Sequence, residues 1–229
     1  MTQSLSRSAL ARLVAAHLPQ QGFVNLGIGA PSHVADHLAA DSGVILHSEN
    51  GILNVGPRPP HGEEDWDLID ASKSPVTMRS GGSYFDSNLS FAMMRGGHID
   101  VAILGAFQVS KTGDLANWTT GESTGSPPGI GGAIDLAVGA KSIWVMMDHT
   151  TRAGQPRIVE QCTYPLTATG VVRRIFTNLA IIDVAPAGLV ITALLEGLSV
   201  DAVQSATAAR LIVDDSMQSI GLDGSIHVI

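Results

Sequence analysis

The sequence predicts an α/β protein built on an open, mainly parallel sheet flanked by helices. Two observations predict this class. Short apolar runs alternate along the chain with segments of helical spacing, and polar or glycine-rich turns follow the apolar runs. The chain has 229 residues, of which 45% are hydrophobic, so it can bury a sizeable core. We therefore expect a single domain over residues 1–229.

The first expected element is an amphipathic helix near the N-terminus. Ser6 or Ser8 is a suitable N-cap, and Pro19 ends the helix. The apolar residues that recur at helical spacing are Leu5, Ala9, Leu10, Leu13 and Val14. This spacing gives the helix one apolar face.

A strand–loop–helix unit and a second strand follow this helix. Residues 23–28 form a short apolar run that predicts a buried strand, and the next helix is expected to begin near His33 with Ser32 as its N-cap. A second apolar strand is expected over 44–47. It ends at 48–51, where an Asn-Gly pair favours a tight turn.

The rest of the chain continues the alternation of strands and helices. The expected elements are a Pro-rich loop over 56–62, strands over 99–104 and 143–147 with a helix over 133–138 between them, a hairpin of 179–184 and 189–194 about the turn 185–188, and a last helix from Val200 with Ser199 as N-cap. Apolar strands of this kind are typical of parallel α/β packing.

Composition limits the classes of partner. The formal net charge is −8 and the pI is near 5.3, without a run of Lys and Arg, so nucleic acid is not an expected partner. Only 15% of the residues are charged, against about 25% in typical soluble domains, which indicates that another chain covers part of the surface. We therefore expect an oligomer.

Cysteine content and apolar runs indicate the compartment. The single cysteine, Cys162, excludes an internal disulfide and is expected to serve packing in a reducing compartment. Residues 2–18 lack the continuous apolar stretch of a signal peptide, and the later apolar runs are too short to span a membrane. A cytoplasmic location is expected.

Polar residues at strand ends are the candidates for chemistry, because ligands of open α/β sheets bind outside the carboxyl ends of the strands. Asn25 and Glu49 hold such positions. A carboxylate there must be desolvated or hydrogen-bonded, which shifts its reactivity; the structural alternative is a capped turn. Gly129, Gly131 and Gly132 open a predicted helix and leave backbone N–H groups free for an anion or an oxyanion.

Other signatures are absent or weak. The glycines match neither a dinucleotide fingerprint nor a P-loop, and close packing is an alternative role for them. His33 and His37 lie four residues apart, but the sequence lacks the Glu that follows the first His in zinc proteases, so two exposed helix histidines are the expected interpretation. No metal site is predicted.

Five segments in order along the chain resemble the B chains of class I CoA transferases. The active-site segment Ser48-Glu49-Asn50-Gly51-Ile52-Leu53 precedes Gly56-Pro57, and the other segments cover residues 24–29, 94–100, 113–118 and 131–136. The resemblance covers nearly the whole chain and implies the CoA transferase fold.

The resemblance also implies a mechanism. Glu49 would attack an acyl-CoA thioester and form a mixed anhydride and then a glutamyl-CoA thioester, in ping-pong fashion and without a tightly bound cofactor. Asn25, Lys73, Gly131 and Gly132 would contact CoA or stabilise the oxyanion, although Lys73 could also be a solvated surface residue. The implied partner is the homologous A chain of the family.

Three positions depart from the family pattern, and other segments indicate the substrate. Asn54 replaces a glycine common in the family, and Asp70-Ala71-Ser72-Lys73 replaces the usual Asn-Ala-Gly-Lys. The segments after Trp118 resemble transferases of 3-oxoadipate, so succinyl-CoA is the expected donor and 3-oxoadipate the expected acceptor, with acetoacetate as the alternative. A dicarboxylate requires a cation, which Arg79, Arg95 or the partner chain could supply. The loop 56–62 is a candidate cover that excludes water.

Two functions of other classes compete with CoA transfer. A non-catalytic ligand-binding domain could use the same scaffold, since fold alone does not decide function, but no basic helix-turn-helix segment is present. A sugar-phosphate isomerase would need an acid/base pair beside a phosphate cradle. The Ser-Glu-Asn-Gly segment favours acyl chemistry over both.

Overall fold

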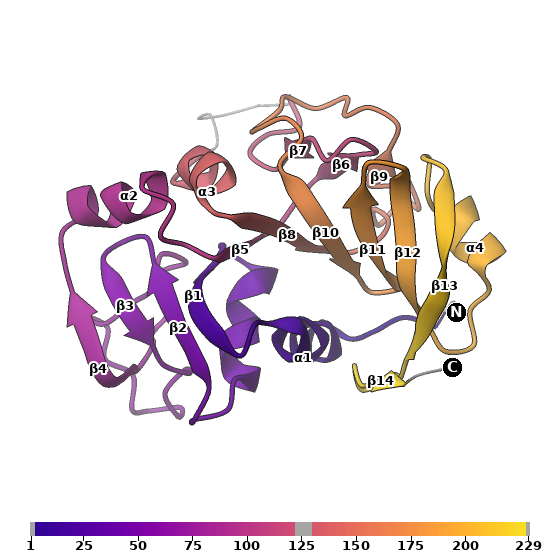
Figure 1. Cartoon of the computed structure of the whole chain (residues 1–229). Helices are drawn as coiled ribbons and strands as arrows, with labels where there is room; N and C mark the ends of the chain where they lie inside the picture. Colours follow the sequence, from indigo (N-terminus) through magenta and orange to yellow (C-terminus); the bar gives the residue numbers. More distant parts are fainter. Residues whose placement is uncertain (1–2, 122–129, 228–229) are drawn as a thin grey trace.

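The computed structural model describes residues 3–121 and 130–227. Its largest element is an 11-stranded sheet (Figure 1), in the order β14-β13-β12-β11-β10-β8-β5-β1-β2-β3-β4. These strands, in chain order, are β1 (Gln21–Leu26), β2 (Gly43–Ser48), β3 (Ile52–Val55), β4 (Met78–Tyr84), β5 (Val101–Leu104), β8 (Ser142–Met147), β10 (Val172–Thr177), β11 (Ala180–Ala185), β12 (Gly188–Leu195), β13 (Leu211–Ile220) and β14 (Ile226–His227). A small sheet of β6 (Gln108–Ser110), β7 (Leu115–Ala116) and β9 (Ile158–Val159) lies beside it.

Parallel pairing prevails in the centre of the large sheet. The five strands β2, β1, β5, β8 and β10 all pair in parallel, whereas β3 and β4 at one end and β11 beside β10 pair antiparallel to their neighbours. In the register of the central strands, Asn25 lies opposite His47 of β2 and Ala102 of β5. The predicted open α/β sheet is confirmed.

Helices cover both faces of the sheet, and strand β5 shows how the core divides between them. Val101 and Ile103 pack with α1 (Arg7–His17) and the 3-10 helix η1 (Ala30–His37). Ala102 and Leu104 pack on the other face, with α2 (Ser87–Arg95) and α3 (Ala133–Gly139). The last helix, α4 (Val200–Ser205), joins this second cluster through Val203. Side chains of a strand alternate between faces, so one buried strand serves two cores.

The helix starts test the sequence predictions directly. Of the two candidates Ser6 and Ser8, Ser6 is the N-cap of α1, and Ser199 is the N-cap of α4 as predicted. Their hydroxyls accept hydrogen bonds from the backbone N–H groups of Ala9 and Ala202. The prediction of Ser32 as an N-cap was wrong, because η1 already begins at Ala30, and the Ser32 hydroxyl donates backward to the Gly29 carbonyl.

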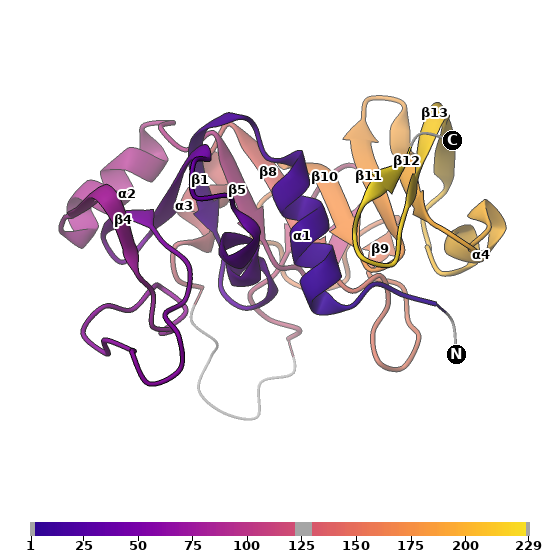
Figure 2. The ribbon, with the colours of Figure 1, turned by 90° about the horizontal axis from the view of Figure 1, so that it is seen from below.

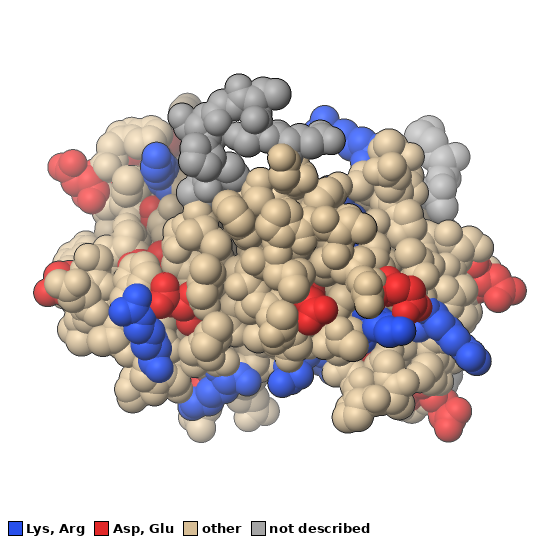
Figure 3. All heavy atoms as spheres, turned by 90° about the horizontal axis from the view of Figure 1, so that it is seen from above, with Lys and Arg blue, Asp and Glu red and all other residues tan. Residues whose placement is uncertain are grey.

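The loop predicted over 56–62 contains no helix or strand. It belongs to the long connection between β3 and β4, which extends from the lower edge of the molecule in Figure 2. Basic and acidic side chains are interspersed on the face seen in Figure 3. Within the described residues, no helix has the length and apolar character needed to cross a membrane.

Candidate active site

Glu49 occupies a tight turn between β2 and β3. The Gly51 N–H donates to the Ser48 carbonyl at 3.0 Å, and Gly51 has a φ of 113°. A side chain at Gly51 would collide with the carbonyl oxygen of Phe85. Glycine is therefore required beside the nucleophile candidate, both for its backbone angle and for space.

A second segment braces this turn from outside the sheet. The Ser48 hydroxyl donates to Asn50 Oδ1 at 2.7 Å and accepts from the Ala71 N–H at 2.9 Å. Asn50 Nδ2 in turn donates to the Ile69 carbonyl at 2.8 Å. Because hydrogen bonds connect both residues flanking Glu49 to residues 69–71, the backbone that carries the Glu49 side chain is held in place.

Asn54, which the resemblance aligns with a glycine common in CoA transferases, has a clear structural role. Its φ is 65°, in the left-handed region where glycine is favoured and asparagine is tolerated better than most residues. Its Nδ2 also donates to the Ser80 carbonyl of β4 at 3.0 Å. The substitution therefore preserves the backbone shape of β3 and adds a link to β4.

The environment of Glu49 tunes its carboxylate. Burial raises its pKa, and interactions with the Gly132 N–H and the Asn25 amide oppose this shift by favouring the charged form, while the negative charge of Asp70 adds to the rise. A Cβ on Gly132 would lie 3.4 Å from Cδ and Oε1 of Glu49, and one on Gly131 would lie 3.8 Å from Oε1. The two glycines thus bring bare backbone against the carboxyl group.

A buried chain of polar groups holds Asn25 beside Glu49. Asn25 Nδ2 donates to His47 Nδ1 at 3.0 Å and to the His47 carbonyl at 3.2 Å. Because Nδ1 accepts, Nε2 carries the proton and donates to Ser90 Oγ of α2 at 3.0 Å. Burial lowers the pKa of His47 to about 4, so its imidazole is neutral at physiological pH.

Glu49 opens into a cavity of about 370 Å³ at the ends of the central strands. This volume lies within the range of small-molecule sites, roughly 300–1,000 Å³. Its walls are mostly apolar, with a few polar groups, and are formed by Gly27, Ile28, Glu49, Leu104, Gly105, Ala106, Phe107, Asn117, Trp118, Ile130, Gly131, Ala133, Leu136 and Arg157.

The structure brings together most of the predicted site residues. Asn25, Gly131 and Gly132 gather around Glu49, whereas Gly129 lies outside the described residues. Lys73 is exposed, with a φ of 61°, in the turn that continues the bracing segment, and it does not line the cavity.

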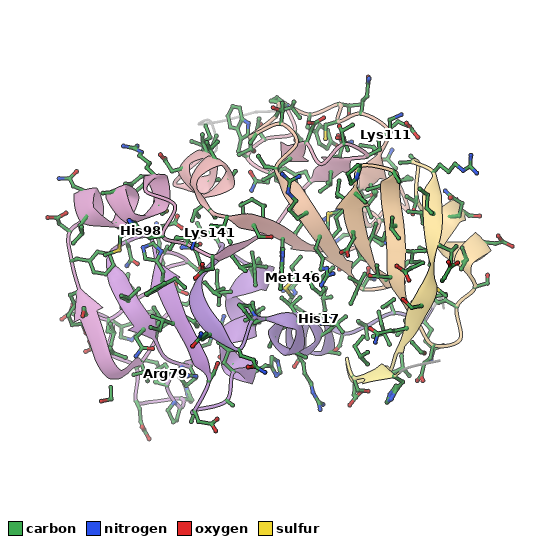
Figure 4. The ribbon with its side chains drawn as sticks, viewed as in Figure 1. His17, Arg79, His98, Lys111, Lys141 and Met146 are labelled. Carbon is green, nitrogen blue, oxygen red and sulfur yellow. The ribbon has the colours of Figure 1, made fainter. Side chains whose placement is uncertain are left out.

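The loop 56–62 and the two predicted cations lie away from the cavity. Gly56 and Arg58 line a separate small space of about 30 Å³ next to Ser48. Arg79 (Figure 4) donates from β4 to the carbonyls of Leu38 and Ala39. Arg95 pairs with Asp135 at 2.6 Å. Neither arginine lines the Glu49 cavity.

Sequence reasoning missed three residues of the site: His47, Ser90 and Arg157. His47 stands in an apolar strand directly before the Ser-Glu-Asn-Gly segment, and a titratable residue at such a place is a usable signal. Ser90 and Arg157 are distant in sequence, and no local pattern marks them.

The remaining candidates serve other purposes. His33 lies 3.8 Å from Asp36, and His37 contacts the Ser8 hydroxyl at 3.3 Å. No group of three or more potential metal ligands occurs among the described residues. Cys162 is half-buried, and burial raises the pKa of its thiol to about 11, which leaves it protonated and unreactive.

An open α/β sheet with a half-buried carboxylate at a strand end, facing bare glycine backbone, is suited to an enzyme of acyl transfer. The chain belongs to the coenzyme A transferase family, whose sequence profile matches residues 7–206. It is 51% identical over 212 residues to the B subunit of the 3-oxoadipate CoA-transferase of Pseudomonas putida. The match covers 93% of this chain and 99% of that protein.

Similarity extends to a second transferase and to a solved structure. The chain is 42% identical over 207 residues to the B subunit of the succinyl-CoA:3-ketoacid coenzyme A transferase of Helicobacter pylori, covering 90% of this chain and 99% of that protein. It shares the fold of an acyl-CoA transferase from Escherichia coli O157:H7, crystallised as a thioester complex with CoA, with a TM-score of 0.72 at 18% identity. That alignment covers 96% of this chain and 44% of the larger one.

Proposed function

We propose that this chain is the B subunit of a CoA transferase that moves CoA from succinyl-CoA to 3-oxoadipate, with Glu49 as the nucleophile. The observation that carries the proposal is a half-buried carboxylate whose charged form is favoured by the Gly132 N–H and the Asn25 amide, and which lines a ligand-sized cavity. Similarity to the Pseudomonas protein supports 3-oxoadipate as acceptor. The Helicobacter relative makes acetoacetate the second candidate.

The first half-reaction consists of two exchanges at carbonyl carbon. A Glu49 oxygen attacks the succinyl-CoA thioester, the C–S bond breaks, and a mixed anhydride and the CoA thiolate result. The thiolate then attacks the Glu49 carbonyl and releases succinate, which leaves CoA as a thioester on Glu49. The negative charge passes from carboxylate to thiolate to carboxylate, so no net proton transfer is required.

The second half-reaction reverses these steps with a different acid. The acceptor carboxylate attacks the glutamyl thioester, and the released thiolate then attacks the acyl carbonyl of the new anhydride, which restores Glu49. The Gly132 N–H is suited to the oxyanion of each tetrahedral intermediate. Asn25 is fully buried and contacts Glu49 from behind the cavity wall, so we propose that it acts on the carboxylate.

The partner and the accessory residues are part of the same proposal. The relatives are B subunits by name, which implies a homologous A chain, and we propose that this A chain completes the site. Lys73 stays a proposed CoA contact, because its segment is hydrogen-bonded to the turn that carries Glu49. The loop 56–62 stays a proposed cover.

The test uses the chain reconstituted with its A chain. With succinyl-CoA, mass spectrometry should find CoA attached to Glu49, and borohydride should reduce the thioester and abolish activity. Glu49→Ala should lower kcat by about 10⁴-fold, because no other carboxylate occupies that position. Glu63→Gln, which removes an exposed acid of the β3–β4 connection, is the matched control. Normal turnover by Glu49→Ala would refute the proposal, and comparing 3-oxoadipate with acetoacetate identifies the acceptor.

A further inference from the structure

Arg157 enters the Glu49 cavity from the opposite half of the molecule. It directly precedes β9, and its backbone is held on both sides. Its N–H donates to the His149 carbonyl at 3.2 Å, and its carbonyl accepts from the Val109 N–H of β6 at 2.9 Å. The backbone of Arg157 is thus held between the small sheet and the segment that follows β8.

The guanidinium of Arg157 lacks an anionic partner. Its Nη1 reaches the Ala106 carbonyl only at 3.5 Å, and its Nε is buried with no hydrogen bond in the described structure. Asp148 lines an adjoining cavity with Arg157, but no described carboxylate, Asp148 included, forms an ion pair with it. Buried donors of a charged group are costly when they are left unsatisfied.

Other cations of the chain are satisfied in place. Arg174 forms a two-pronged pair with Asp183, Lys141 pairs with Asp100, and Arg95 pairs with Asp135. Arg79 uses two backbone carbonyls. Arg157 therefore differs from these four residues both in lining the cavity and in having donors to spare.

A second donor in the same cavity also lacks a partner. Trp118 lines the cavity, and its buried Nε1–H makes no hydrogen bond in the described part of the chain. An indole N–H only donates, and a guanidinium only donates. Two residues of the cavity wall thus keep donors without a partner, and a cationic side chain there favours a ligand group with a negative charge. Arginine matches a carboxylate with two parallel hydrogen bonds.

We propose that Arg157, assisted by Trp118, binds the distal carboxylate of a dicarboxylic acyl group and so selects dicarboxylic over monocarboxylic substrates. This inference rests on the proposed function, since it assigns one end of the substrate to Glu49. The reacting carboxyl group lies at Glu49 and the second carboxylate lies against Arg157. Arg157 replaces Arg79 and Arg95 as the candidate cation for the substrate carboxylate, because neither of those residues lines the cavity.

The experiment compares two acyl-CoA donors on the reconstituted pair of chains. Formation of the Glu49–CoA thioester is measured with succinyl-CoA, which carries a second carboxylate, and with acetoacetyl-CoA, which does not. Arg157→Gln should lower kcat/KM for succinyl-CoA by about 10- to 100-fold and that for acetoacetyl-CoA by less than about 3-fold. Arg157→Lys should fall between, since it keeps the charge and loses the fork.

Controls separate specificity from folding and from failure of the mechanism. Arg79→Gln should change neither value, and thermal unfolding reports whether each variant is folded. Trp118→Phe should give a smaller loss that is again confined to succinyl-CoA. Equal losses with both thioesters would mean that the guanidinium contacts the CoA moiety or has a structural role. No change in either kcat/KM value would mean that Arg157 has no role in binding. Either result overturns the inference. Absence of the Glu49 adduct in the unmodified pair would instead refute the proposed function.

Discussion

Two fully buried histidines, one in each half of the sheet, make similar hydrogen bonds but have different roles. His47 closes β2 and hydrogen-bonds Asn25 and Ser90. His149 follows β8, and its ring nitrogens lie 2.9 Å from Thr177 Oγ1 and 2.8 Å from Thr207 Oγ1. Burial lowers the pKa of each to about 4, so both are neutral at physiological pH.

The difference lies in what the hydrogen-bonded neighbours touch. Asn25 contacts Glu49, so His47 orients a group that favours the charged form of the Glu49 carboxylate. Thr177 and Thr207 instead tie β10 to the end of α4, because Thr207 also donates to the Val203 carbonyl. Burial and a lowered pKa therefore do not distinguish a residue that positions the site from a structural one. The distinction depends on what the histidine's hydrogen-bonding partner itself contacts.

The two regions should differ most when a hydrogen-bonding partner of each histidine is replaced. Asn25→Ala should slow Glu49–CoA formation by about 100- to 1,000-fold, because the carboxylate loses a preorganised amide. Thr207→Val should change that rate by less than about 3-fold, yet lower the free energy of unfolding by about 1–3 kcal/mol through the unsatisfied His149. Rapid-quench kinetics and urea unfolding measure the two effects. Equal kinetic losses would break the comparison.

The pH dependence of stability should show where the two histidines behave alike. Unfolded histidine has a pKa near 6.5 and each folded one a pKa of about 4, so protons bind the unfolded chain preferentially between these values. The stabilisation is complete above pH 6.5 and falls as the pH drops toward 4, by about 3 kcal/mol for each histidine. Urea titrations at several pH values should show that the free energy of unfolding falls less on acidification in both His47→Gln and His149→Gln than in the unmodified chain. A change in only one variant would show that the two environments differ.

The smallest effect is the kinetic one of the histidines themselves. His47→Gln should lower the rate of adduct formation by about 10-fold, because Asn25 becomes less well fixed. The pKa of Glu49 should rise further as the Asn25 interaction weakens, so the rate should begin to fall at a higher pH as the solution is acidified. His149→Gln should leave both the rate and its pH profile unchanged. An unaltered profile in His47→Gln would assign His47 a structural role only.

Elements that depend on local interactions could be predicted from the sequence, whereas elements that depend on distant segments could not. Local signals located α1 with its Ser6 cap, the turn at Asn50-Gly51 and the hairpin of β11 and β12. Strand β4 was not predicted, since its sequence, Met-Arg-Ser-Gly-Gly-Ser-Tyr, is polar and glycine-rich and owes its structure to pairing with β3. Strand β13 mixes apolar and acidic residues and was missed for a similar reason.

The site divides along the same line. Glu49, Asn25 and the glycine pair stand at strand or helix ends that a pattern can locate. Arg157 reaches the cavity only because β6 and β9 pair beside the large sheet, a contact between distant segments. Asn54 had an unknown effect from sequence, because its positive φ and its bond to Ser80 belong to the folded backbone.

The parallel centre of the sheet joins strands that are far apart in the sequence. Strand β1 joins β2 on one side and β5 on the other, and β5 follows β1 only after a long stretch of chain. Closing such loops is slow compared with forming helices or hairpins. The Glu49 turn is held by a local hydrogen bond, whereas its contact with Gly132 requires α3 to lie against the sheet. A chain in which α3 is not docked against the sheet therefore lacks the Gly132 backbone beside Glu49, so the carboxylate environment depends on the complete fold.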